Sequence, residues 1–208
     1  MLGLWRWPRR RLLLTSVGVL SASASIISLF LYGAGILPMY FFIDTLAAPS
    51  LLTILVLGIF ARRIDETVFL NRLVIGSWLG LVATAAYDAA RVPVWVSGAI
   101  TFDPFFTIQQ FGQIITGYPV GSMTAIVVGL LYHYWNGFGF GVIYTLVAGP
   151  AKWYYGLVWA LFLEAGWLLA LPPILHIALG LPLVAVSLFG HAVYGTVLGV
   201  VSHRLIKS

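Results

Sequence analysis

The chain has 208 residues, of which 61% are hydrophobic and only 8% are charged, and it has a formal net charge of +5 and no cysteine. A soluble domain of this size cannot bury so much apolar surface, so the composition indicates an integral membrane protein. The lack of cysteine excludes disulfides, thiolate metal sites, iron–sulfur clusters and cysteine nucleophiles. The basic residues lie at the ends of apolar runs, which is typical of membrane topology and not of nucleic-acid binding.

The first apolar run has the features of a signal peptide. Tryptophans and arginines at 5–11 precede the apolar segment 12–20, and small residues follow at 21–25. The apolar run continues as far as Leu37, however, which is long enough to cross a bilayer. We therefore predict an uncleaved signal anchor.

Apolar runs of spanning length predict six transmembrane helices in an all-α bundle, which forms a single domain over residues 1–208. The predicted helices are 12–34, 39–61, 71–95, 122–147, 153–171 and 183–204. Pro49 is expected to kink the second helix or to mark its start, and Pro93 is expected to loosen the end of the third.

The charges of the predicted loops orient the bundle. Six spans place both termini on one side, and that side collects every lysine and arginine except Arg91: Arg6, Arg9, Arg10, Arg11, Arg62, Arg63, Arg72, Lys152, Arg204 and Lys207. The opposite loops, 37–42, 96–121 and 172–182, contain no lysine or arginine. The positive-inside rule therefore predicts cytoplasmic termini in the plasma (inner) membrane of a bacterium or archaeon.

The longest opposite loop contains a pattern typical of a short helix. Asp103 and Pro104 are helix-start residues, and Gly117 is a helix-end residue. Apolar residues fall on one face and glutamines on another, which predicts an interfacial helix on the outer side. This helix either caps the bundle or acts as a lid, in which case Gln109 and Gln113 would contact the substrate at the entrance.

Ionisable side chains inside the predicted spans are the main functional indication, because such residues are costly in hydrocarbon. They are Asp88, Arg91, His133, Glu164 and His191. With a helical rise of ~1.5 Å per residue, all of them fall in the outer half of the bilayer. The sequence therefore predicts a buried polar site to which several helices contribute.

Asp88 and Arg91 lie three residues apart and share a helix face. One interpretation is a structural ion pair. The other is an anion clamp, in which Arg91 binds a phosphate or carboxylate of the substrate while Asp88 orients it and takes part in catalysis.

His133, His191 and Glu164 form a candidate metal site. Two imidazoles and one carboxylate are a common ligand set for zinc or non-haem iron, and Glu164 is also a candidate acid–base catalyst. Asn136 and Tyr194 share helix faces with the histidines and are candidate substrate contacts.

The two histidines also begin similar segments, which read H-x-x-x-G-x-x-x-G-V at 133–142 and at 191–200. This similarity indicates an internal duplication, or glycines used only for close helix packing. Histidines on two such helices could also hold a b-type haem between them, which is the alternative cofactor.

These observations favour a membrane-embedded enzyme, metal-dependent or not, that acts on a lipid-like or amphiphilic substrate. The alternatives are a proton-coupled transporter or permease, a haem redox protein, and a scaffold subunit whose buried charges are purely structural.

Overall fold

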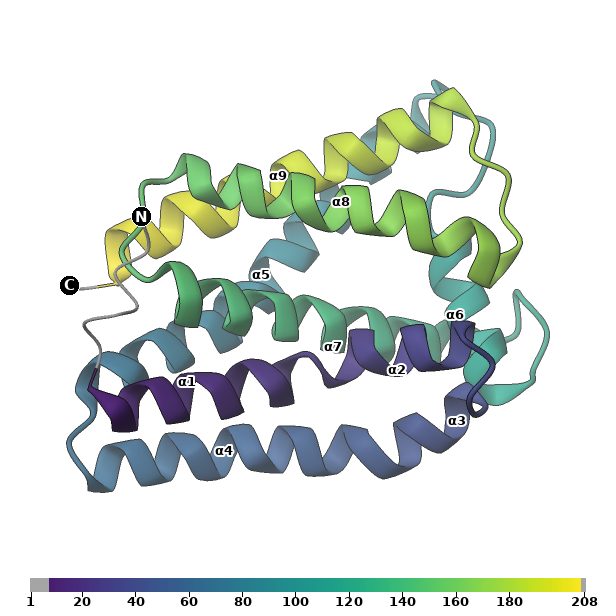
Figure 1. Cartoon of the computed structure of the whole chain (residues 1–208). Coiled ribbons are helices and arrows are strands. Elements are labelled where there is room, and N and C mark those ends of the chain that lie inside the picture. Colours follow the sequence, from purple (N-terminus) through teal and green to yellow (C-terminus); the bar gives the residue numbers. More distant parts are fainter. Residues whose placement is uncertain (1–7, 207–208) are drawn as a thin grey trace.

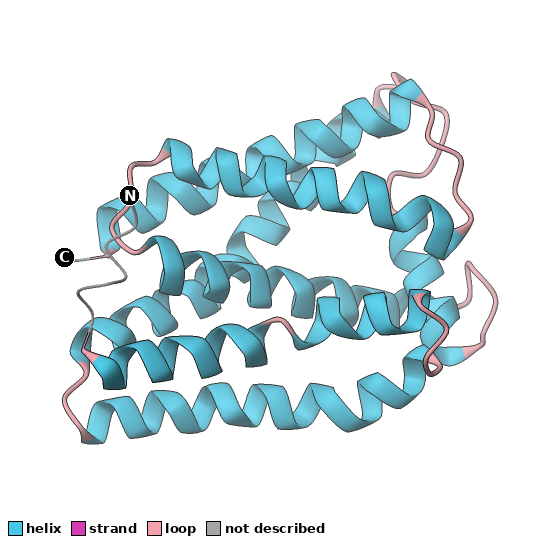
Figure 2. Ribbon diagram, in the orientation of Figure 1, coloured by secondary structure: helices cyan, strands magenta, loops and turns pink. Residues whose placement is uncertain are grey.

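The computed structural model describes residues 8–206, and within this range the chain is all-helical (Figure 2). The predicted flanking residues Arg6 and Lys207 lie outside the described residues. The helices are α1 (Arg9–Ala22), α2 (Ala24–Gly33), α3 (Met39–Phe42), the π-helical turn η2 (Ile43–Ala47), α4 (Ala48–Arg63), α5 (Thr67–Val96), α6 (Phe106–Thr116), α7 (Met123–Ala148), α8 (Tyr154–Leu175) and α9 (Leu181–Leu205).

Five of the described helices are long and apolar enough to cross a membrane, namely Met39–Arg63, α5, α7, α8 and α9. The bent pair α1 and α2 brings the number to six if the pair forms one span. Many large apolar side chains on these helices are exposed, including Leu52, Leu55 and Val56 on α4. Lipid is the solvent that such surfaces require, so the composition and the fold agree on a membrane protein.

The first predicted span, 12–34, is broken at Ser23, where α1 and α2 meet at an angle of 49°. The Ser23 hydroxyl donates a hydrogen bond to the Val19 carbonyl at 2.8 Å. Serine hydroxyls that bond the preceding turn often bend helices. Just after the break, the Ser25 carbonyl of α2 accepts a hydrogen bond from the Tyr132 hydroxyl of α7 at 2.9 Å.

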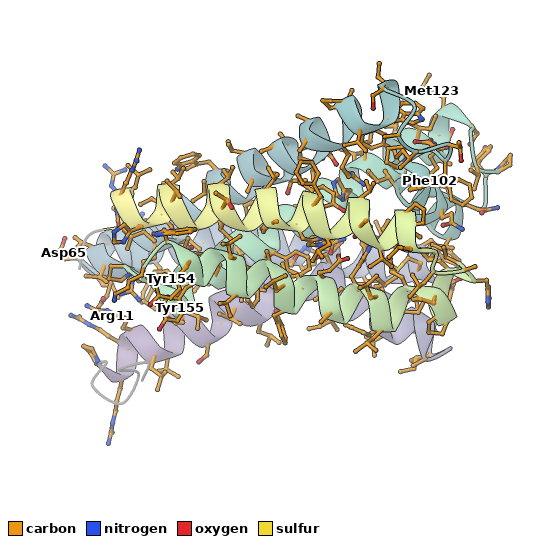
Figure 3. The ribbon with its side chains drawn as sticks, turned by 90° about the horizontal axis from the view of Figure 1, so that it is seen from above. Arg11, Asp65, Phe102, Met123, Tyr154 and Tyr155 are labelled. Carbon is orange, nitrogen blue, oxygen red and sulfur yellow. The ribbon has the colours of Figure 1, made fainter. Side chains whose placement is uncertain are left out.

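The start of α1 and the end of α9 lie at the same end of the bundle (Figure 1). Arg11, Asp65, Tyr154 and Tyr155 gather there, and Phe102 lies at the opposite end (Figure 3). We call the first of these the arginine-rich end. The predicted topology of the spans and the cytoplasmic location of the arginine-rich end remain predictions.

Two prolines do not end α8, although the sequence predicts a boundary at 171. The helix passes through Pro172 and Pro173 to Leu175 and stops at His176, which has a left-handed φ of 54°. Each proline removes one backbone donor and leaves the carbonyl four residues earlier without its helical partner, but the last turn still forms. The predicted boundary at 171 is therefore wrong by about one helical turn.

The predicted short helix is present as α6, which lies at the end opposite the arginine-rich end (Figure 1). Its apolar face, including Ile108 and Phe111, is buried. Part of this face packs against α7, where a Cβ at Gly112 would collide with the backbone of Ala125. The apolar face of α6 therefore contacts the protein, and a membrane-interface location of this helix remains a prediction.

Two helical hairpins form the half of the bundle that carries the ionisable residues. Helix α5 packs closely along α7, and α8 packs closely along α9. The hairpins join through α5 and α9, whereas α7 and α8 touch at only a few residues. This unequal packing decides where cavities remain.

Candidate functional site

Asp88 of α5 lies at the centre of the first polar group. Its Oδ1 atom accepts hydrogen bonds from Arg91 Nη2 and, at 3.1 Å, from His133 Nε2 of α7. The side chains of Asp88 and His133 are only 14% and 18% exposed. The pair thus ties α5 to α7 by charged groups inside the bundle.

Arg91 links this group to the loop before α6. Its Nη1 atom donates to the Pro104 carbonyl at 2.7 Å, and its guanidinium lies 4.1 Å from the Tyr87 ring centroid and 4.8 Å from that of Phe105. Two of its nitrogens are therefore engaged by the protein, and Nε is buried without a partner. A substrate anion would have to compete with Asp88 for this guanidinium.

Glu164 of α8 and His191 of α9 form the second polar group. Glu164 Oε2 lies 2.7 Å from His191 Nδ1 and accepts a hydrogen bond from the Ser187 hydroxyl at 2.8 Å. Glu164 is 2% exposed, and its Oε1 atom has no hydrogen-bond partner among the described residues. A buried carboxyl oxygen of this kind is expected to bind a water molecule or a ligand.

The backbone determines which nitrogen of His191 carries the proton. Nδ1 also lies 3.0 Å from the carbonyl oxygen of Ser187, and a carbonyl can only accept. Nδ1 therefore donates to this carbonyl and to Glu164, and the neutral ring has its lone pair on Nε2. This arrangement of carboxylate and imidazole is the one that makes histidine an effective general base.

Tyr87 lies against the histidines of both groups. Its ring centroid is 5.0 Å from that of His191 and 6.0 Å from that of His133. Gly190 makes room for the Tyr87 ring, because a Cβ at that position would lie 2.6 Å from a ring carbon. The two polar groups thus share one aromatic neighbour and form a single site with contributions from four helices.

A cavity of about 60 Å³ lies between the two groups, with His133, His191, Asn136 and Tyr194 among its lining residues. Asn136 is 6% exposed, and its Oδ1 atom is buried without a partner. Tyr194 donates its hydroxyl to the Gly137 carbonyl at 3.3 Å. The cavity has room for several water molecules or a small polar group.

A second cavity of about 60 Å³ continues towards α6 and shares Tyr87, His133 and Trp167 with the first. It in turn shares Phe102 and Thr107 with a wider depression of about 410 Å³ near the loop before α6. The site therefore connects with the end of the bundle opposite the arginine-rich end.

The predicted glutamines do not line these cavities. Gln109 donates to the Asp103 carboxylate at 2.7 Å, and Gln113 is exposed. Thr107 and Ile108 of the same helix face the cavity instead. Asp103, at the start of the helix, holds the Gln109 amide away from these cavities, and contact of Gln109 or Gln113 with a substrate remains a prediction.

The predicted metal ligands do not gather around one point. Among residues 8–206, no three histidine, aspartate or glutamate side chains lie close enough to hold a metal ion. Glu164 binds His191, whereas His133 binds Asp88. The predicted set of His133, His191 and Glu164 is therefore divided between two carboxylate–histidine pairs.

The haem alternative requires a large flat space between His133 and His191. The cavity that both residues line measures about 60 Å³, and pockets for drug-sized ligands have ~300 Å³ or more. The Tyr87 ring also packs on both imidazoles. The side chains of the site therefore do not fit a porphyrin, which is larger still.

Residues 70–208 match a protein-family model described as a family of unknown function, DUF6789. The chain belongs to the DUF6789 family. The matched segment covers about two thirds of the chain and contains both carboxylate–histidine pairs, Tyr87 and Asn136. No curated protein and no solved structure matches the chain.

The DUF6789 segment places the two carboxylate–histidine pairs at equivalent positions. On α5, Asp88 follows Gly80 by eight residues, and on α8, Glu164 follows Gly156 by the same distance. The partner histidines on α7 and α9 each begin the H-x-x-x-G-x-x-x-G segment. In each hairpin, the first helix therefore carries the carboxylate and the second carries the histidine.

The packing of the glycines supports this equivalence. A Cβ at Gly80 would collide with the carbonyl oxygen of Gly137, four residues after His133. A Cβ at Gly156 would collide with the carbonyl oxygen of Gly195, four residues after His191. The glycines are used for close packing, as the commoner interpretation predicts. Because they meet in the same register, we describe α5–α7 and α8–α9 as two copies of one hairpin.

Sequence reasoning missed Ser187, which fixes both Glu164 and His191. The available signal was its position four residues before His191, which places both on one face of the helix. The aromatic contact of Tyr87 with both histidines left no such signal, because it depends on how α5 packs against α7 and α9.

Proposed function

We propose that the protein is a membrane-embedded enzyme in which the Glu164–His191 pair acts as a general base on an amphiphilic, lipid-like substrate. The observation that carries the proposal is the His191 ring, held through Nδ1 by Glu164 and Ser187 while it lines the polar cavity. In this tautomer Nε2 accepts a proton from a hydroxyl group or a water molecule in the cavity.

The residues around the cavity indicate that His191 activates a water molecule or a hydroxyl group of the substrate, and not a side chain of the protein. The Ser187 hydroxyl donates to Glu164, and the Thr84 hydroxyl donates to the Gly80 carbonyl. Neither is placed as a nucleophile beside His191. The unpartnered Oδ1 of Asn136 accepts a hydrogen bond from the bound group and orients it.

The apolar packing between the site and the arginine-rich end favours an enzyme over a transporter. Towards the arginine-rich end, Leu79, Ala83, Tyr144 and Leu198 form a buried cluster between the hairpins. A proton or solute pathway needs polar groups or water across the whole bilayer, and this cluster interrupts it. Two of the polar site's neighbouring hollows lead towards the opposite end.

The proposal is tested with the purified protein in vesicles of a bacterial polar lipid extract, with mass spectrometry of the lipids over time. Wild type should convert at least one lipid component, and His191→Gln or Glu164→Gln should slow the conversion ~10²-fold or more. Lipid conversion at the wild-type rate in both variants would contradict the proposal. Proton flux measured with a trapped pH-sensitive dye, without any lipid product, would favour the transporter.

A second measurement does not require the substrate. Diethyl pyrocarbonate acylates the unprotonated nitrogen of imidazole, and a hydrogen-bonded carboxylate makes that nitrogen more nucleophilic. His191 should therefore react several-fold faster in wild type than in Glu164→Gln, with the exposed His203 as the reference in the same sample. An unchanged rate ratio would show that Glu164 does not activate His191.

A further inference from the structure

The two hairpin copies face each other along two equivalent interfaces, α5 with α9 and α7 with α8, which we call seams. Among the described residues, only the α5–α9 seam is closely packed. Exchanging the copies turns the α5–α9 contact into an α8–α7 contact. In the closed seam, the Tyr87 ring packs on Gly190. At the equivalent positions α8 has Leu163 and α7 has Tyr132, whose hydroxyl instead donates to the Ser25 carbonyl of α2. The α7–α8 seam therefore lacks the aromatic residue that fills its counterpart.

The open seam contains an apolar groove of about 300 Å³. Residues of α2, α7 and α8 line it, and these helices lie on one side of the bundle in Figure 1. The lining residues are almost all apolar or aromatic, among them Phe30, Phe140, Ile143, Trp159 and Phe162. The groove lies beside helices long enough to span the bilayer, so hydrocarbon is the surrounding solvent.

The groove ends at the candidate site. Phe140, Leu163, Trp167 and His191 line both the groove and the polar cavity. A molecule in the groove therefore has its apolar part against aromatic side chains and its polar end beside His191.

We infer that the α7–α8 groove binds one hydrocarbon chain of a bilayer lipid, which enters laterally between the two hairpins. The chain places the polar part of the lipid at the His191 cavity. This inference deepens the proposed function and rests on it for the chemistry, although chain binding itself does not depend on catalysis.

Gly166 allows a direct test, because it lines the groove and a Cβ there would meet no atom within 4 Å. Gly166→Phe should fill the groove and still fold. Gly58→Phe is the matched control, because Gly58 lines a separate apolar groove of about 650 Å³ between α4 and α5 and has only Leu73 nearby, at 3.6 Å.

The protein is reconstituted in phosphatidylcholine vesicles that contain a small fraction of phosphatidylcholine with a photoactivatable diazirine in one acyl chain. After illumination, mass spectrometry maps the labelled residues. Wild type should be labelled at Phe140 and Ile143, inside the groove. In Gly166→Phe this labelling should fall about tenfold, equivalent to a loss of ~1.4 kcal/mol in chain binding, whereas Gly58→Phe should retain it.

Two results would overturn the inference: equal labelling of Phe140 in wild type and Gly166→Phe, or an equal loss in Gly58→Phe. Glu164→Gln should keep the wild-type labelling, because it leaves the groove intact. If labelling follows these expectations while wild type converts no lipid, the chain-binding site stands and the proposed enzyme falls. Lipid turnover that persists in Gly166→Phe would show that the substrate reaches His191 by another route.

Discussion

Replacing Asp88 by asparagine is expected to destabilise the protein by about 3 kcal/mol, because the permanently charged and buried Arg91 loses its carboxylate. Glu164→Gln should cost only about 1 kcal/mol, because the histidine beside Glu164 can stay neutral while the amide oxygen still accepts the Ser187 hydroxyl. Reversible unfolding in mixed micelles measures both losses. The comparison separates a carboxylate required for folding from one required for chemistry.

The control is the double variant Asp88→Asn with Arg91→Met, which removes the unpaired charge together with its partner. It should be more stable than Asp88→Asn alone, since the buried guanidinium is the source of the cost. If Asp88→Asn unfolds like wild type, then the Pro104 carbonyl and the rings of Tyr87 and Phe105 are sufficient to stabilise Arg91.

Gly156→Ala is expected to produce a loss of similar size, about 3 kcal/mol, through packing alone. The new methyl group would collide with the Gly195 carbonyl and lie 2.6 Å from the Gly199 Cα, and neither backbone atom can move without separating α8 from α9. Thermal unfolding in detergent, followed by circular dichroism, is the measurement.

The control lies on the same helix. Gly166→Ala places its methyl group in open space and should leave stability unchanged or slightly higher. Gly80→Ala, at the equivalent position of the other hairpin, should match the loss at Gly156. A strong effect at Gly156 with none at Gly80 would contradict the description of the hairpins as two copies of one unit.

The helices were predictable because their signals are local. The predicted span 71–95 appears as Thr67–Val96, and the predicted span 183–204 appears as Leu181–Leu205. The break at Ser23 was not predicted, because not every serine hydroxyl that bonds the preceding turn bends its helix; the outcome depends on packing, here beside the contact of Tyr132 with Ser25.

The candidate site was predictable in its members but not in their pairing. Helical rise converts sequence position into depth, so the common depth of Asp88, His133, Glu164 and His191 follows from the sequence. Which carboxylate meets which histidine depends on how each helix is rotated against its neighbours. The predicted metal triad joined Glu164 to both histidines, whereas the packing of the hairpins joins Asp88 to His133.

By itself, the amino-acid sequence determined that this protein is helical, that it has the composition of a membrane protein and that the ionisable residues inside its predicted spans lie at a similar depth. Hydropathy and helical rise act along the chain, so these features follow from it directly. Only the tertiary structure decided that α7 and α8 remain apart while α5 and α9 close. The difference arises because the Tyr87 ring packs on Gly190 and fills the α5–α9 seam. At the equivalent position of the α7–α8 seam, Tyr132 donates its hydroxyl to the Ser25 carbonyl instead, and the seam stays open.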